Sequence, residues 1–127
     1  MVRGGLKRGA VVALAAACVV AFPGTSSGDT RRVRAKGSPG NFRWDPDFRH
    51  IVKGDRIVWK NRTDYKHHIK SYGGNWSFSK DLVVDGRVRK RFRRAGTFKY
   101  RCNIPGHSTL QSGNCSGMCG VIHVTKN

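Results

Sequence analysis

The sequence alternates apolar and polar residues over short stretches, and no stretch of usable length has the period of an amphipathic helix. Phe42 and Trp44 alternate with polar residues, and Phe98 and Tyr100 do the same later in the chain. A repeat of two residues is typical of strands that bury one face. The chain is therefore expected to be all-β, with two sheets packed as a sandwich.

Turn residues separate the expected strands. Residues 30–36 are basic and place Val33 and Ala35 on one face, which predicts an edge strand or an ordered arm. The tight turn Lys53-Gly54-Asp55 lies between two apolar runs, and residues 71–80, rich in Gly and Ser, predict a loop. Asp85-Gly86 predicts a hairpin that leads into a charged strand at residues 88–92.

The beginning of the chain has the composition of an export signal. Arg3, Lys7 and Arg8 precede an apolar stretch at residues 10–22 that is short for a membrane span, and small residues follow. This pattern predicts a secretory signal at residues 1–28 and one domain at residues 29–127, secreted or held in the periplasm or cell envelope. A retained anchor and lipid attachment at Cys18 remain as alternatives.

The chain is strongly basic. Its net charge of +18 falls to +15 when the three basic residues of the predicted signal are removed. Such a surface attracts polyanions and acidic partners over long range. Because an exported protein rarely meets nucleic acid, an acidic partner protein or an anionic cell-envelope surface is expected instead. The plainer alternative is a surface that is generally rich in Arg.

The cysteine count leaves one thiol over. Of the four cysteines, three follow Cys18, so an oxidising compartment would leave an odd one unpaired. The simplest allocation keeps Cys102 for a metal ion and pairs Cys115 with Cys119. The alternative pairs Cys102 with one of the other two, which would abolish a metal site there.

A thiolate, an imidazole and a thioether follow one another in the last third of the chain, as Cys102, His107 and Met118. The first of them ends an expected strand at residues 97–101. Soft sulfur ligands together with imidazole suit copper in both of its oxidation states. A further imidazole is available from His67 or His68.

These motifs resemble those of the cupredoxins, the small blue copper proteins such as azurin and plastocyanin. Cys102-Asn-Ile-Pro-Gly-His107 is similar to the azurin spacing, and Met118-Cys-Gly120 is similar to the family's exit into its last strand. Three upstream motifs also match the family in order: Phe42-Arg-Trp44, Val52 to Asn61 and His67-His-Ile69. Together the resemblance covers about residues 40–125.

The resemblance implies a Greek-key β-sandwich that holds one copper ion and carries electrons without being an enzyme. By the family's register His67 is the upstream ligand, although a slip of one residue would select His68. Cys102 and His107 would complete the plane, with Met118 as a weak axial ligand. His107 would lie near the surface as the electron port, an amide such as that of Asn103 would bond the Cys102 sulfur, and a monomer with an acidic redox partner is expected.

The stretch between His107 and Met118 departs from the family, because eleven positions separate the two residues and familiar members have fewer. Gln111 is therefore a rival axial ligand. The spacing of Cys115, Cys119 and His123 also resembles a binuclear purple copper centre. Two further alternatives remain: an envelope copper-delivery protein with the same ligands, and a metal-free sandwich that coats anionic polymers. The chain has no Glu and no paired catalytic carboxylates, which argues against an enzyme.

Overall fold

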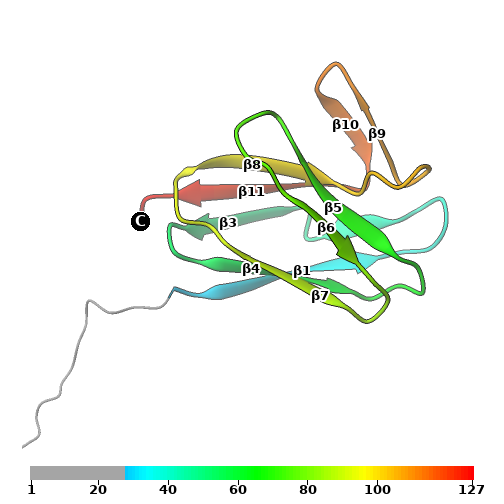
Figure 1. Ribbon diagram of the computed structural model, residues 1–127, viewed down its shortest axis with the longest axis horizontal. Coiled ribbons are helices and arrows are strands. Elements are labelled where there is room, and N and C mark those ends of the chain that lie inside the picture. Colours follow the sequence, from blue (N-terminus) through cyan, green and yellow to red (C-terminus); the bar gives the residue numbers. More distant parts are fainter. Residues whose placement is uncertain (1–27) are drawn as a thin grey trace, which may run out of the picture.

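The structure is a computed structural model that describes residues 28–127, and within this range every regular element is a strand (Figure 1). The strands are β1 (Thr30–Lys36), β2 (Arg43–Asp45), β3 (Phe48–Val52), β4 (Arg56–Asn61), β5 (His67–Tyr72), β6 (Ser79–Leu82), β7 (Arg87–Arg91), β8 (Gly96–Arg101), β9 (Ser108–Gln111), β10 (Asn114–Gly117) and β11 (Cys119–Thr125). The all-β prediction is confirmed.

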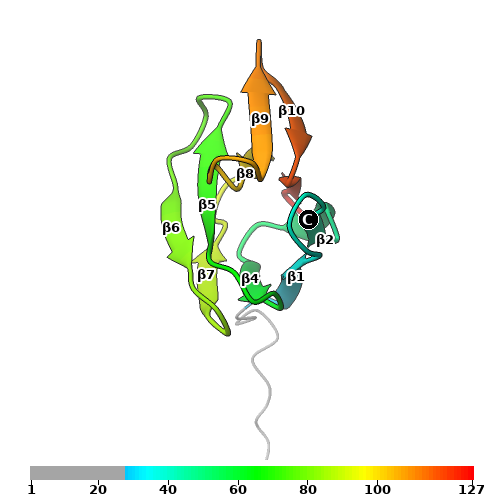
Figure 2. The same cartoon turned by 90° about the vertical axis from the view of Figure 1, so that its right-hand side faces the viewer.

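Two sheets form the sandwich and a separate hairpin projects from it (Figures 1 and 2). One sheet has the order β2-β1-β4-β7 and the other has the order β3-β11-β8-β5-β6, while β9 pairs only with β10. Most neighbours are antiparallel, but β1 runs parallel to β4 and β3 runs parallel to β11. Because β3 lies in one sheet and β2 and β4 lie in the other, the chain crosses between the layers repeatedly, as a Greek-key sandwich requires.

The core lies between the two sheets and confirms the alternating pattern. Phe98 and Tyr100 of β8 point inward and are buried, as are Val33 and Ala35 of β1. Tyr100 packs against Gly120 so closely that a Cβ atom there would lie 2.4 Å from its hydroxyl oxygen. Position 120 therefore has to be glycine for this ring to fill the core.

The expected strand at residues 30–36 is confirmed, but it is an edge only over residues 30–33, because residues 34–36 lie between β2 and β4. It pairs with β4 along its length and with β2 at its end, where Ala35 lies opposite Trp44. The turn after β1 brings the short strand β2 back alongside it. Pairing that depends on a three-residue strand leaves little trace in the sequence.

The Asp85-Gly86 turn forms but does not make a hairpin. The Gly86 N–H donates to the Val83 carbonyl at 2.8 Å, and Asp85 has a positive φ of 62°. However, β6 and β7 lie in different sheets, so this turn carries the chain from one layer to the other. Val83 and Val84 are exposed at this crossing. The predicted loop is also shorter than residues 71–80, because β5 continues to Tyr72 and β6 begins at Ser79.

The predicted signal segment, including Cys18, lies outside the described residues except for Gly28. Among residues 28–127, no helix has the length and apolar character needed to cross a membrane.

Candidate metal centre

Three side chains from separate segments meet at one end of the sandwich. His67 begins β5, Cys102 directly follows the neighbouring strand β8, and His107 lies in the turn before β9. The Cys102 Sγ lies 3.3 Å from the His107 Nδ1 and 3.8 Å from the His67 Nδ1, and the two Nδ1 atoms lie 3.2 Å apart. The structure therefore brings together two imidazoles and one thiol that are distant in sequence.

The structure places His67, and not His68, beside Cys102. His67 is buried and shares the inward face of β5 with Ile69. The His68 ring points the other way, where its Nδ1 lies 2.7 Å from the Asp81 carboxylate and its Nε2 lies 2.7 Å from the Ser79 hydroxyl. Its backbone N–H nevertheless donates to the Cys102 Sγ at 3.3 Å.

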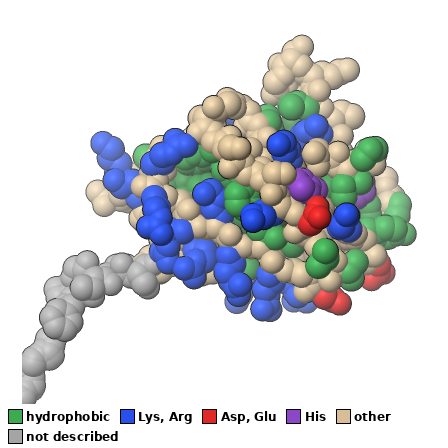
Figure 3. Space-filling view, in the orientation of Figure 1, with side chains coloured by type: hydrophobic (Ala, Val, Ile, Leu, Met, Phe, Trp, Pro, Cys, Tyr) green, Lys and Arg blue, Asp and Glu red, His purple; other side chains and the backbone are tan. Residues whose placement is uncertain are grey.

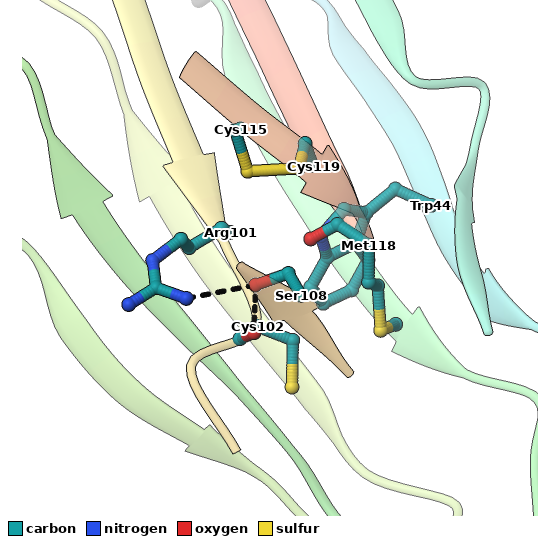
Figure 4. Close-up of a disulfide and its surroundings, with 7 residues drawn as sticks. All are labelled: Trp44, Arg101, Cys102, Ser108, Cys115, Met118 and Cys119. Carbon is teal, nitrogen blue, oxygen red and sulfur yellow. Dashed lines mark hydrogen bonds between the residues drawn. A yellow bond between two sulfur atoms is a disulfide. The ribbon is translucent and has the colours of Figure 1, made fainter. Parts of the chain in front are cut away.

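Met118 is fastened to both of its neighbours in the site through its backbone. Its N–H donates to the His107 carbonyl at 2.9 Å, and its carbonyl accepts the Cys102 N–H at 3.0 Å. The side chain is fully buried, and Figure 4 shows it pointing the same way as the side chain of Cys102. Gln111, in contrast, is exposed at the end of β9 in the projecting hairpin.

The long separation between His107 and Met118 is taken up by the β9–β10 hairpin. Ser108 pairs with Gly117, so the chain leaves the site and returns to it at adjacent points. Ser112 and Gly113 both have positive φ, as a two-residue hairpin turn requires. The hairpin therefore adds residues without displacing Met118.

The disulfide joins Cys115 to Cys119, with the two Cα atoms 6.1 Å apart, and Cys102 is a buried free thiol (Figure 4). The pairing of Cys115 with Cys119 is confirmed and Cys102 is left unpaired, so the alternative that uses Cys102 in a bridge is wrong. The binuclear alternative fails too, because both of its cysteines are bonded to each other. Its third residue, His123, lies on the outer side of β11, where its Nδ1 lies 3.0 Å from the Thr97 hydroxyl.

A hydrogen-bonded group of side chains holds His67 from behind. The His67 Nε2 lies 2.7 Å from the Thr63 Oγ1, which also lies 2.8 Å from the Asn61 Oδ1. With its proton on Nε2, His67 donates to Thr63, Thr63 donates to Asn61, and the lone pair of Nδ1 faces Cys102. Asn61 is anchored in turn by its amide group, which donates to the Tyr65 and Leu82 carbonyls.

Sequence reasoning missed these supporting residues. Asn61 and Thr63 come shortly before His67, but nothing in their spacing marks them as a support. Trp44 was expected only as a core residue, yet its Nε1 donates to the Met118 carbonyl at 3.1 Å across 74 positions of sequence. The amides that hydrogen-bond the Cys102 sulfur are those of His68 and Ile104, whereas that of Asn103 was the one expected.

Burial sets the protonation of the three groups. Burial, reinforced by the nearby His107 ring, lowers the pKa of His67 from 6.5 to about 4, and burial also lowers the pKa of His107. The pKa of the Cys102 thiol is raised by burial, and the amides of Ile104 and His68 partly oppose that rise. Both imidazoles are therefore neutral near pH 7 and have lone pairs to offer, whereas the thiol needs a metal cation to lose its proton readily.

One edge of the site opens toward solvent. His107 is partly exposed beside a groove that is also lined by Phe42, Arg43 and Gly106. Its ring packs against Phe42 with the centroids 4.7 Å apart, and Phe42 also packs against His67 at 4.8 Å. Arg43 is the only charged side chain among the residues that line this groove.

The donor set fits copper. Two imidazole nitrogens and one sulfur lie within 4.8 Å of one another, and no carboxylate belongs to this cluster of described residues. Soft thiolate and imidazole ligands suit copper, while carboxylate and carbonyl oxygens would suit harder ions. His67, Cys102 and His107 could hold such an ion, with the Met118 thioether available beside them.

No protein-family model and no curated protein matches this sequence. Solved structures do match. A purple cupredoxin from Nitrosopumilus maritimus is 18% identical with a TM-score of 0.59, and the alignment covers 74% of this chain and 98% of that chain. An oxidized mutant of amicyanin is 18% identical with a TM-score of 0.56, covering 73% of this chain and 79% of that chain.

A copper-containing nitrite reductase from Thermus scotoductus SA-01 is 19% identical with a TM-score of 0.59. Its alignment covers 76% of this chain but only 22% of the reductase, so the likeness is to one part of that enzyme. At sequence identities of 18–19%, this structural similarity shows a shared arrangement of the strands, which is the fold alone. By the order and pairing of its strands, this chain has the cupredoxin fold.

Proposed function

We propose that this protein is an exported type 1 blue copper protein that carries electrons by outer-sphere transfer. The observation that supports the proposal best is the convergence of the His67 Nδ1, the Cys102 Sγ and the His107 Nδ1 next to the buried Met118 side chain. One copper ion per chain would supply one-electron chemistry between its two oxidation states. No bond of a substrate needs to change, so the proposed role is that of a carrier and not of an enzyme.

The surroundings of the site suit this role because they keep the ligands in place. His67 and Cys102 belong to neighbouring strands of one sheet, and Thr63 fixes the orientation of the His67 ring. Ligands that are held this way need little rearrangement when the charge of the site changes. His67, Cys102 and Met118 are buried and His107 is partly exposed, so the edge of His107 would offer a path for an electron between the site and solvent.

Copper loading tests the proposal directly. We expect the chain from Asp29 onward, which contains all eleven strands, to turn intensely blue with one equivalent of Cu(II). Its electron spin resonance spectrum should show the four lines of a single copper ion. The variant Cys102→Ser should lose the blue colour and stay folded, while the double variant Cys115→Ser/Cys119→Ser should keep the colour. A colourless wild-type complex would contradict the proposal.

The axial ligand needs its own pair of variants. Met118→Leu should change the reduction potential and the visible spectrum, because the thioether is proposed to approach the copper weakly. Gln111→Leu is the matched control and should change neither, since Gln111 is exposed in the hairpin. The reverse result would assign the axial role to Gln111.

Electron exchange separates a carrier from a copper-delivery protein. A carrier should show a reversible redox couple and fast self-exchange while it keeps its copper. A delivery protein would hold Cu(I) and release it to a chelator or to a partner. N-terminal sequencing of the protein recovered from its own host would test export, since cleavage near Gly28 is proposed.

A further inference from the structure

The outer side of the four-stranded sheet carries a dense array of cations. In β1 and β4 the buried inward residues are Val33, Ala35, Ile57 and Trp59, and in β7 the half-buried Val88 packs against the core. The alternate positions of these strands therefore point outward. Figure 3 shows the Lys and Arg side chains gathered along the lower edge of the molecule, where Figure 1 places these strands. We call this surface the arginine face and define it by six outward residues: Arg32, Arg34, Arg56, Lys60, Arg87 and Arg89.

The strand register places these cations in rows. One row runs directly across the three strands and consists of Arg34, Lys60 and Arg87. In the next row, Val58 of β4 lies between Arg32 and Arg89. Strands β1, β4 and β7 contain no acidic residue. The ion pairs among the described residues, Arg31–Asp29, Lys36–Asp45 and His68–Asp81, involve none of the six. Since like charges directly opposite each other destabilise a sheet, this array calls for an anionic counterpart outside the chain.

The arginine face lies away from the proposed electron port. His107 comes between β8 and β9, outside the four-stranded sheet, and Figure 2 shows β1 and β4 at the bottom of the molecule, far from β9. The groove beside His107 contains a single charged side chain, Arg43. A redox partner that docked by charge on the arginine face would therefore sit away from the site with which it has to exchange electrons.

The shape of the arginine face suits a broad anionic surface better than a single strand of nucleic acid. Its cations are spread over three strands instead of following one groove, and none of the outward positions is aromatic, so bases would find nothing to stack on. A hollow between β1, β4 and β7 is lined by Arg32, Arg56, Arg87 and Arg89 around Val58, and a phosphate group could be held there.

We propose that the arginine face binds the phosphate headgroups of an anionic lipid membrane and leaves the His107 end uncovered for redox exchange. The membrane contact uses none of the metal ligands, so it is independent of the copper content of the protein. The electrostatic attraction of several basic residues to an anionic lipid surface adds up and is screened by salt. Binding should therefore be strong at low ionic strength and weak at high ionic strength.

Vesicle sedimentation tests the proposal with the chain from Asp29 onward. We expect binding to phosphatidylglycerol–phosphatidylcholine vesicles and none to pure phosphatidylcholine vesicles. Arg32→Gln/Arg89→Gln should lower the partition coefficient on the order of tenfold or more, since each basic residue near such a surface contributes about fivefold. Both arginines are exposed and no side-chain hydrogen bond of theirs is described, so the variant should fold, which its circular dichroism would confirm.

Lys70→Gln/Lys99→Gln is the matched control, because it removes the same charge from the outer side of the other sheet. It should bind vesicles nearly as well as the wild type. Equal losses in both variants, or no vesicle binding by the wild type, would overturn the proposal. The proposal would also be overturned if the arginine face bound an acidic polypeptide or heparin but did not bind the vesicles. If millimolar free phosphate releases the protein from vesicles at constant ionic strength, the hollow would be a site for the free anion and the membrane assignment would fail.

The same vesicle experiment with Cys102→Ser keeps the two proposals distinct. This variant should bind vesicles as the wild type does even though it has lost its copper site. A wild type that stays colourless with Cu(II) but binds vesicles would contradict the proposed function alone. A wild type that turns blue but does not bind vesicles would contradict the membrane proposal alone.

Discussion

Thr63 connects the His67 ring to the strands behind it. Its hydroxyl lies between the His67 Nε2 and the Asn61 Oδ1, so it determines which ring nitrogen keeps its lone pair for a metal. Cys102 and His107 follow from their spacing in the sequence, but this support does not. It depends on how the short connection between β4 and β5 folds, which places the Thr63 hydroxyl between the Asn61 and His67 side chains.

Removing the Thr63 hydroxyl should weaken copper binding without unfolding the protein. We expect Thr63→Val to lower the copper affinity about 10- to 100-fold, as is usual when a partner of a ligating histidine is lost. Competition with a chelator of known affinity would measure this loss. Thr97→Val is the matched control, because Thr97 lies 3.0 Å from His123 on the outer side of the sheet and should leave the affinity unchanged.

The stability of the copper-free protein should fall as the pH is lowered from about 6.5 toward 4. The folded state holds the pKa of His67 at about 4, whereas the ordinary value of 6.5 applies to the unfolded chain. Between these values the unfolded chain binds the proton more tightly, so acid favours unfolding, and the loss levels off below the lower pKa. Urea unfolding at several pH values would measure it, and His67→Gln should show a shallower dependence than His123→Gln.

At the scale of the elements, the β9–β10 hairpin is a separate unit that one disulfide joins to the start of β11. The hairpin leaves and rejoins the body between His107 and Met118, both of which are bonded to the body independently of it. The bond between Cys115 and Cys119 closes a short loop at the start of β11. We therefore expect this bond to stabilise this end of the molecule and to have little effect on the position of the metal ligands.

Removing the disulfide should therefore lower stability and spare the copper site. For Cys115→Ser/Cys119→Ser we expect a loss of at most about 2 kcal/mol in the free energy of unfolding, because the closed loop is short. Urea unfolding would measure the loss, and the visible spectrum of the copper-loaded variant would report the site. A shifted spectrum would show that the bridge helps to position Met118, contrary to this expectation.

The strands themselves were largely predictable, whereas their assignment to sheets was not. Alternation in Phe98 and Tyr100 identified both a strand and its inward face, because burial of one face leaves a two-residue period. The turn at Asp85-Gly86 was also found. Turn chemistry is local, however, and the pairing of β7 with β4 and not with β6 depends on contacts that no local pattern encodes.

For the molecule as a whole, the distribution of charge matters more than its total. The net charge of +18 is evident from composition, but its concentration on one side of a sheet depends on the register of β1, β4 and β7. The metal ligands lie at one end and the cations along one side. The sequence therefore predicted an anionic partner without indicating which surface would meet it.

Relieving the repulsion on the arginine face should stabilise the fold. Arg87 lies directly opposite Lys60, so Arg87→Gln is expected to raise the free energy of unfolding by about 0.2–1 kcal/mol at low salt. Lys99→Gln is the control, because Lys99 lies opposite Val121 and Tyr72 and has no cation directly across from it. Unfolding curves at low and high ionic strength would measure both, and added salt should remove the difference.

The closed base of the hairpin makes its tip a convenient handle. Ser112 and Gly113 can be exchanged or extended while Ser108 and Gly117 stay paired. A dye, an electrode tether or a foreign peptide could be grafted at this tip, with the copper ligands left in their places.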